Sequence, residues 1–153
     1  MKGIWRWIIG ILIALVIIGL LGFVHSNRQN YWLARGGGES TFTDIEWFWV
    51  SVTDKATNTI TNVPDPKMYT IIFSKDGSLE GRADCNNFAG SYSQENGGFF
   101  ITIAAVTQAY CGEGSLDTQY LSLLTSVAAG GQDGAGALAL ETAGGAQRME
   151  FVR

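Results

Sequence analysis

Two cysteines, Cys85 and Cys111, are the residues whose chemistry can be judged most directly, and no other cysteine occurs in the 153 residues. Such a pair can form a disulfide in an oxidising compartment, remain as two free buried thiols, or act in thiol redox chemistry. Arg82 is the only basic residue near Cys85, so little in the sequence would favour a reactive thiolate. A structural disulfide is therefore the favoured interpretation.

Other side chains that commonly carry out catalysis are scarce. The single histidine, His25, lies beside an apolar N-terminal run, which removes Ser-His-Asp and Cys-His catalysis as usually built. Two cysteines without a neighbouring histidine cannot complete a zinc site of the usual kind. The glycines at 36–38 follow no strand and open no helix, unlike a phosphate-binding loop. We expect no catalytic residue, no metal, no cofactor and no enzymatic activity.

The N-terminal run at 7–24 carries no charge. A helix over this run would span about 27 Å, close to the thickness of a bilayer core. Trp5 and Trp7 stand where interfacial aromatic residues are usual. The sequence therefore predicts a transmembrane anchor within residues 1–26. The alternative is a signal peptide cleaved near Ser26, which would give a secreted protein.

Residues 27–43 are predicted to form a flexible, glycine-rich tether, and residues 44–153 to form the folded domain. Four basic residues and no acidic ones precede Glu39. The chain from Glu39 onward therefore contains 6 of the 10 basic residues and all 14 acidic ones. This excess of acid argues against nucleic-acid binding. Charges flanking the apolar run are nearly balanced, but the cysteine pair favours a single-pass cell-membrane protein with its C-terminal domain outside the cytoplasm.

Runs of alternating apolar and β-branched residues predict strands in the folded domain. Asp76-Gly77 between two such runs is a strong hairpin signal, because glycine accepts the positive φ of the turn. The polar segment 54–66 is expected to be a loop. The predicted strands cover residues 45–53, 68–74, 78–83, 89–93, 99–103, 137–141 and 147–152.

One helix is expected after the second cysteine. Ser115 can cap its start, and Gly130-Gly131 is expected to end it. Its apolar stripe, which should cover the sheet, consists of Leu116, Tyr120, Leu123, Leu124 and Val127. The predicted fold is α+β: a small curved antiparallel sheet of about seven strands, built as a hairpin meander, packed on one helix and preceded by the transmembrane helix.

The order of these motifs resembles the META domain family, also called the heat-shock protein HslJ-like family, over residues 45–152. The resemblance implies a small β-rich, often envelope-exposed domain, linked in bacteria to envelope stress and antibiotic tolerance, without catalysis. Known bacterial members carry a lipoprotein anchor, whereas this chain is expected to have an apolar helix in its place. The residues that carry the resemblance, with a structural role implied, are Trp49, Asp84, Cys85, Asn86, Asn87, Gly90, Tyr92, Thr107 and Cys111.

Together these observations predict a membrane-anchored, extracytoplasmic binding or envelope-stress module whose ligand is undefined. Its partners would be the membrane, through residues 7–24, and an envelope protein, a peptide or a small amphiphile. An alternative is a structural accessory subunit of a membrane complex. In that case Gly19 and Gly22 would allow close approach of a second membrane helix.

Overall fold

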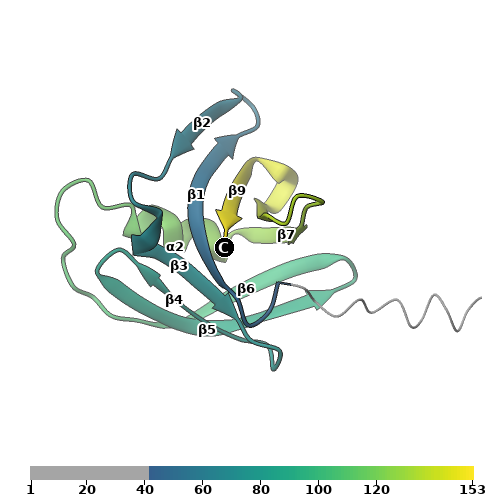
Figure 1. Cartoon of the computed structure of the whole chain (residues 1–153), viewed down its shortest axis with the longest axis horizontal. Coiled ribbons are helices and arrows are strands. Elements are labelled where there is room, and N and C mark those ends of the chain that lie inside the picture. The colour runs from purple at the N-terminus through teal and green to yellow at the C-terminus, as the bar shows by residue number, and fades with distance from the viewer. Residues whose placement is uncertain (1–41) are drawn as a thin grey trace, which may run out of the picture. The chain divides into compact units, whose positions relative to one another are not determined.

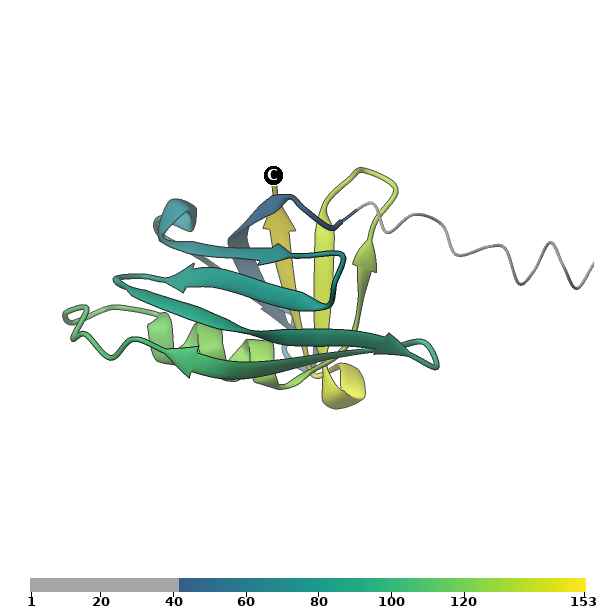
Figure 2. The ribbon, with the colours of Figure 1, turned by 90° about the horizontal axis from the view of Figure 1, so that it is seen from below.

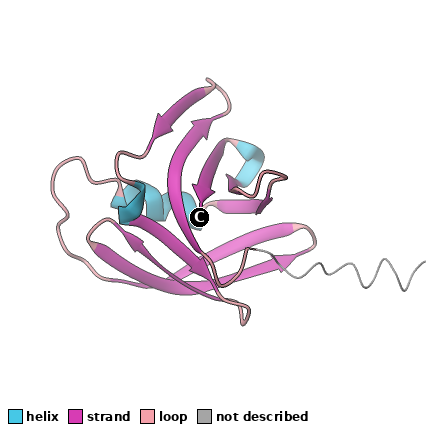
Figure 3. Cartoon of the chain, viewed as in Figure 1, coloured by secondary structure: helices cyan, strands magenta, loops and turns pink. Residues whose placement is uncertain are grey.

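The strand that carries two tryptophans, β1 (Glu46–Asp54), lies at the centre of the sheet. The structure is a computed structural model, and it describes residues 42–153. Strands and helices of this part of the chain are shown in Figure 1 and Figure 3. The remaining elements are β2 (Thr59–Asn62), a 3₁₀ turn (Pro66–Met68), β3 (Tyr69–Phe73), β4 (Ser78–Ala83), β5 (Asn86–Glu95), β6 (Gly98–Val106), α2 (Asp117–Thr125), β7 (Val127–Gln132), β8 (Leu138–Thr142), a 3₁₀ turn (Ala143–Gly145) and β9 (Gln147–Val152).

All strand pairs of this sheet are antiparallel. The strand order is β6-β5-β4-β3-β1-β9-β8-β7, and β2 pairs with the part of β1 that β3 leaves uncovered. The two end strands, β6 and β7, come to lie beside each other, so the sheet curls almost into a barrel (Figure 1, Figure 2). The prediction of an α+β domain with a curved antiparallel sheet is confirmed.

The expected number of strands is wrong, because the described residues contain nine. The sequence predicts a loop at 54–66, yet this segment contains β2, whose four residues are all exposed. Ser51 pairs with Asn62 and Asp54 with Thr59, so these two strands form a short hairpin at one end of the sheet. A strand that is short, exposed and polar on most positions lacks the alternation on which sequence reasoning depends.

A β-bulge explains why β1 has apolar residues at both odd and even positions of its sequence. Trp49 pairs with Phe151 and Ser51 with Glu150, so Val50 is an extra residue without a partner on β9. The bulge shifts the alternation by one residue. Trp49 and Val52 therefore face the same side of the sheet although their numbers have opposite parity, and both are buried.

The helix is shorter than expected. It ends at Thr125, and Ser126 caps it by donating its N–H to the carbonyl oxygens of Leu123 and Leu124. The prediction that Gly130-Gly131 ends the helix is wrong, because both glycines lie inside β7. A side chain at Gly130 would press on Leu140 and Phe99, so glycine allows β7 to lie close to its neighbours.

The start of α2 also differs in detail. Leu116 is the N-cap, not Ser115. The Ser115 hydroxyl still contributes at this end, since it accepts the N–H of Asp117 at 3.2 Å. The helix therefore begins one residue later than a serine cap would place it.

Aromatic packing fixes α2 on the concave face of the sheet. Tyr120 is fully buried, and its ring stacks on Trp49 with centroids 5.0 Å apart. Tyr69 and Phe88 meet the same ring edge-on. Phe42 is buried against Phe73, so the packed body already includes residue 42, two positions before the expected start of the domain.

The predicted membrane anchor, residues 7–24, lies outside the described residues. Within residues 42–153, no helix has the length and apolar character needed to cross a membrane.

Candidate functional site at the disulfide corner

The turn between β4 and β5 forms a sharp corner at Asp84, whose φ of 57° lies in the left-handed region. Three contacts hold Asp84 there. Its N–H donates to Met68 O at 2.7 Å, its carbonyl oxygen accepts Arg82 Nε at 2.6 Å, and its carboxylate accepts the hydroxyl of Tyr69 at 3.3 Å. Asp and Asn tolerate this conformation better than most residues do. The corner therefore presents the next residue, Cys85, at the surface.

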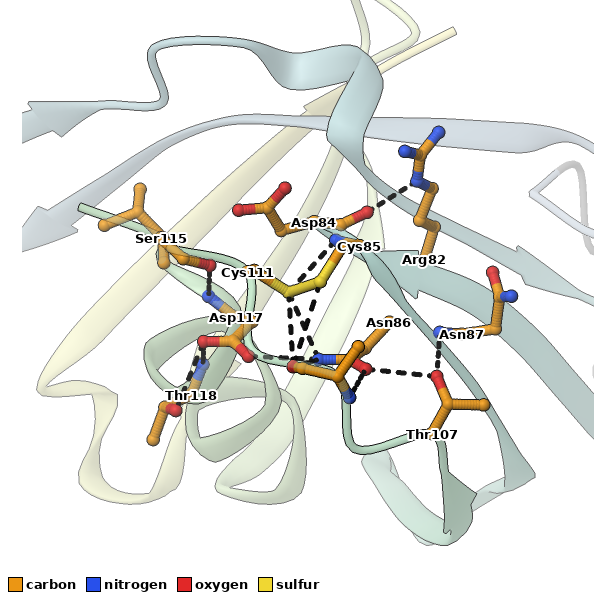
Figure 4. The surroundings of a disulfide bond; sticks show 12 residues. Arg82, Asp84, Cys85, Asn86, Asn87, Thr107, Cys111, Ser115, Asp117 and Thr118 are labelled. Atoms are coloured by element: carbon orange, nitrogen blue, oxygen red, sulfur yellow. Dashed lines mark hydrogen bonds between the residues drawn. A yellow bond between two sulfur atoms is a disulfide. The ribbon is translucent and has the colours of Figure 1, made fainter. Parts of the chain in front are cut away.

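A disulfide joins Cys85 to Cys111 and ties the corner to the segment between β6 and α2 (Figure 4). Of the three states considered for the cysteines, the structure contains the disulfide. Both sulfurs lie close to the carbonyl oxygen of Ala109, at 3.8 and 3.7 Å. These are contacts and not hydrogen bonds, because neither sulfur of a disulfide carries a hydrogen.

Asn86 is the most connected side chain of the corner, and it is buried. Its Oδ1 accepts the N–H of Ala109 at 2.7 Å and the hydroxyl of Thr107 at 3.1 Å. Its Nδ2 donates to Ala109 O at 3.0 Å and to Asp117 Oδ2 at 3.3 Å. Thr107 in turn accepts the N–H of Asn87 at 2.9 Å. One amide thus links the β4–β5 corner, the segment after β6 and the first turn of α2.

Tyr69 holds the C-terminal end of the segment that links β6 to α2, residues 107–116. Its hydroxyl accepts the N–H of Leu116, the N-cap of α2, at 2.9 Å while it donates to Asp84. The segment from 107 to 116 is therefore held at three places: by Asn86 at its start, by the disulfide in its middle and by Tyr69 at its end.

The other residues that carry the family resemblance lie away from the corner. The indole of Trp49 is buried in the core and donates to Ser51 O at 2.8 Å. A Cβ at Gly90 would collide with the carbonyl oxygen of Thr102 and with Cα of Ile103, so only glycine fits at this irregularity in the pairing of β5 with β6.

Tyr92 lies near the opposite end of the sheet from the disulfide. Its hydroxyl donates to Ser74 O at 2.9 Å, and its ring packs on Phe73 and Phe99. Burial raises the pKa of Tyr92, and the nearby carboxylates of Asp44 and Asp76 raise it further. Tyr92 therefore acts as a neutral anchor for the end of the sheet.

A shallow pocket of about 230 Å³ lies beside the disulfide. Three carboxylate side chains line this pocket, and no basic side chain lines it. Tyr110, next to Cys111, is 84% exposed, more than any other large hydrophobic side chain in residues 42–153. The lining residues are Pro64, Asp65, Met68, Tyr69, Asp84, Cys111, Glu113, Gly114 and Ser115.

Sequence reasoning identified the cysteines, Asn86 and Thr107 but missed Tyr69 and Asp117 as members of the corner. Tyr69 resembles any core aromatic at the start of a strand, and Asp117 resembles a first-turn acid that favours a helix. Among residues 42–153, no three histidine, cysteine or acidic side chains are arranged to hold a metal ion. What the corner can do chemically is thiol exchange at its sulfurs and non-covalent binding in its pocket.

Comparison with known proteins identifies a family and related folds. A family model described as the META domain matches residues 40–153. An NMR structure of a protein from Burkholderia xenovorans has a TM-score of 0.59 at 23% identity and covers 73% of this chain and 83% of that one. A crystal structure of a DUF4847 family protein from Bacteroides vulgatus has a TM-score of 0.57 at 14% identity, with coverage of 74% and 95%. No curated protein matches significantly. At such identities the two structures show the shared fold alone.

Proposed function

The chain belongs to the META domain family, and we propose that it is a non-catalytic binding module of the cell envelope. A membrane helix at 7–24 would anchor it, and the domain would lie outside the cytoplasm. Its ligand class would be an envelope protein, a peptide or a small amphiphile. The role would be in envelope stress or drug tolerance.

The disulfide corner is the observation that carries this proposal. A bond between Cys85 and Cys111 persists in an oxidising compartment and is rare in the cytosol. An apolar run of spanning length precedes the domain. Both features are accounted for together if the chain crosses the membrane once and its domain folds on the far side.

The pocket beside the disulfide is the surface that we assign to the ligand. Asp65, Asp84 and Glu113 line it without a basic neighbour, so a positively charged group would be attracted. Tyr110 adds an exposed ring of the kind that often anchors a partner. Because the segment 107–116 is held at both ends and in its middle, little ordering entropy would be lost on binding.

Protease treatment of intact cells tests the topology. A protease added outside should digest the domain of the full-length chain without cell lysis. Protection until the membrane is broken would refute an extracytoplasmic domain.

Site-specific photo-crosslinking in membranes tests the binding surface. A photoreactive residue at Tyr110 should capture a partner that the same residue at Phe100 does not. Phe100 is a matched control because it is also an exposed aromatic, 50% exposed, and lies on β6 toward the opposite end of the β5–β6 hairpin. Crosslinks obtained only from positions in 7–24 would favour the accessory-subunit alternative.

A further inference from the structure

The two sulfurs of the disulfide have unequal surroundings. Cys111 Sγ faces two N–H donors: the backbone N–H of Cys85 at 3.3 Å and Nδ2 of Asn86 at 3.2 Å (Figure 4). Within the described part of the chain, no N–H group donates to Cys85 Sγ. Negative charge that appears on Cys111 would therefore be stabilised, whereas negative charge on Cys85 would not.

The two cysteines also differ in their exposure to solvent. Cys85 is an exposed residue, whereas Cys111 is half-buried. An incoming thiolate therefore reaches Cys85 more readily than Cys111.

We propose that Cys85 is a thiolation site, the sulfur at which a low-molecular-weight thiol opens the bond. The thiolate of the incoming molecule attacks Cys85 Sγ and forms a new sulfur–sulfur bond with it. The Cys85–Cys111 bond breaks, and its electron pair leaves on Cys111 Sγ as a thiolate. One disulfide is consumed and one is formed, so no separate oxidant or reductant is needed. Attack by Cys111 on Cys85 Sγ reverses the step.

The corner keeps its shape when the bond opens. Asn86 still holds the segment at Ala109 and Thr107, and Tyr69 still holds it at Leu116. The part freed lies between these anchors and includes Tyr110. Thiolation would therefore loosen the pocket wall locally without unfolding the sheet.

Mapping of the mixed disulfide tests this proposal. The full-length oxidised chain is exposed briefly to β-mercaptoethanol, quenched with an alkylating agent and digested without reduction. Mass spectrometry should find the thiol on Cys85 and the alkyl group on Cys111, in about tenfold excess over the reverse. Equal amounts, or an excess of adduct on Cys111, would overturn the proposal.

Two variants test whether the N–H donors set the direction. Asn86→Ala removes the Nδ2 donor and should reduce the excess about threefold. Thr107→Val disturbs the same network without touching the sulfur, so its excess should equal that of the unaltered chain. Unchanged selectivity in folded Asn86→Ala would refute the role of the donor. Near-ultraviolet circular dichroism checks that each variant is folded. If one of the variants does not fold, the mapping of the mixed disulfide in the unaltered chain decides the proposal.

Discussion

The side-chain amide of Asn86 pairs with the backbone of Ala109 through both of its polar ends, as one strand residue pairs with another. Oδ1 accepts the Ala109 N–H at 2.7 Å, and Nδ2 donates to the Ala109 carbonyl at 3.0 Å. The segment 107–109 continues past the end of β6 without a ladder partner at this residue, and the amide supplies one. A carboxylate has no donor and alanine has neither group, so the pairing requires an amide.

Replacement of this amide should be costly. Asn86→Ala removes a buried side chain and leaves the N–H and carbonyl groups of Ala109 without their partner at a partly buried corner, and we expect a loss of roughly 1–3 kcal/mol in the free energy of unfolding. Urea denaturation measures it. The neighbouring Asn87 is the matched control, because its exposed side chain makes no hydrogen bond in the described structure. Asn87→Ala should change stability by less than about 0.5 kcal/mol, and equal losses in the two variants would contradict the pairing.

The disulfide should stabilise the domain mainly through its unfolded state. The bond closes a loop with a sequence separation of 26, for which the chain-entropy model gives about 3–4 kcal/mol. The double variant Cys85→Ser with Cys111→Ser should therefore unfold at lower urea, with a larger m-value because its unfolded chain is less compact. A serine at 111 can still accept the two N–H groups that face the sulfur. A loss well under 1 kcal/mol would show that the loop is already restricted when unfolded.

Regular patterns in the sequence were enough to predict the class of fold. The strands at 78–83 and 147–152 have the predicted bounds, and a glycine-containing turn precedes each of them. Errors arose where a local signal has two structural meanings. Val127 fits both the apolar stripe of a helix and the start of a strand, and its pairing with Thr142 decides for the strand. Gly130 similarly suits a helix end and a crowded strand.

The corner could be predicted only in part. Cys85 and Asn86 stand out by their types, but the reach of Asn86 to Ala109 and Asp117 depends on how β6 and α2 return to the corner. No local spacing contains that information. Tyr69 is a stronger case, because its hydroxyl joins residues from two other segments. Such contacts arise from tertiary packing, which sequence periodicity does not report.

One surface ion pair should give a small dependence of stability on pH. The hydrogen bond from Lys55 at 2.8 Å lowers the pKa of Glu141, and the charges of Lys55 and Arg148 lower it further. Because the folded pKa lies below the ordinary value of 4.5, this contribution is present above that value. It is lost as the pH falls through the folded pKa.

Lys55→Met should therefore lower the free energy of unfolding by less than about 1 kcal/mol at neutral pH, since both side chains are partly exposed. The difference from the unaltered chain should shrink in acid. Urea denaturation across the acid range measures it. Lys67→Met is the control, because Lys67 makes no ion pair within residues 42–153. A difference that grows in acid would contradict the assignment.

Tyr120 carries a hydroxyl that the fold does not use. The residue is fully buried, and its hydroxyl has no hydrogen-bond partner among the described residues. Burial also raises the pKa of Tyr120 well above its ordinary value, so the hydroxyl stays protonated at neutral pH. A buried polar group without a partner costs about 1–3 kcal/mol. Its removal should therefore not destabilise the domain.

Tyr120→Phe should accordingly leave the free energy of unfolding unchanged or raise it by about 1 kcal/mol, because the ring packing on Trp49 is kept. Tyr69→Phe is the matched control: it is also a buried tyrosine, but its hydroxyl bonds to Leu116 and Asp84. That variant should lose about 1–3 kcal/mol. Thermal and urea unfolding of both variants measure the contrast. An equal loss of unfolding free energy in the two variants would contradict this prediction. It would show that the Tyr120 hydroxyl forms a hydrogen bond in solution, in addition to the stacking of its ring on Trp49.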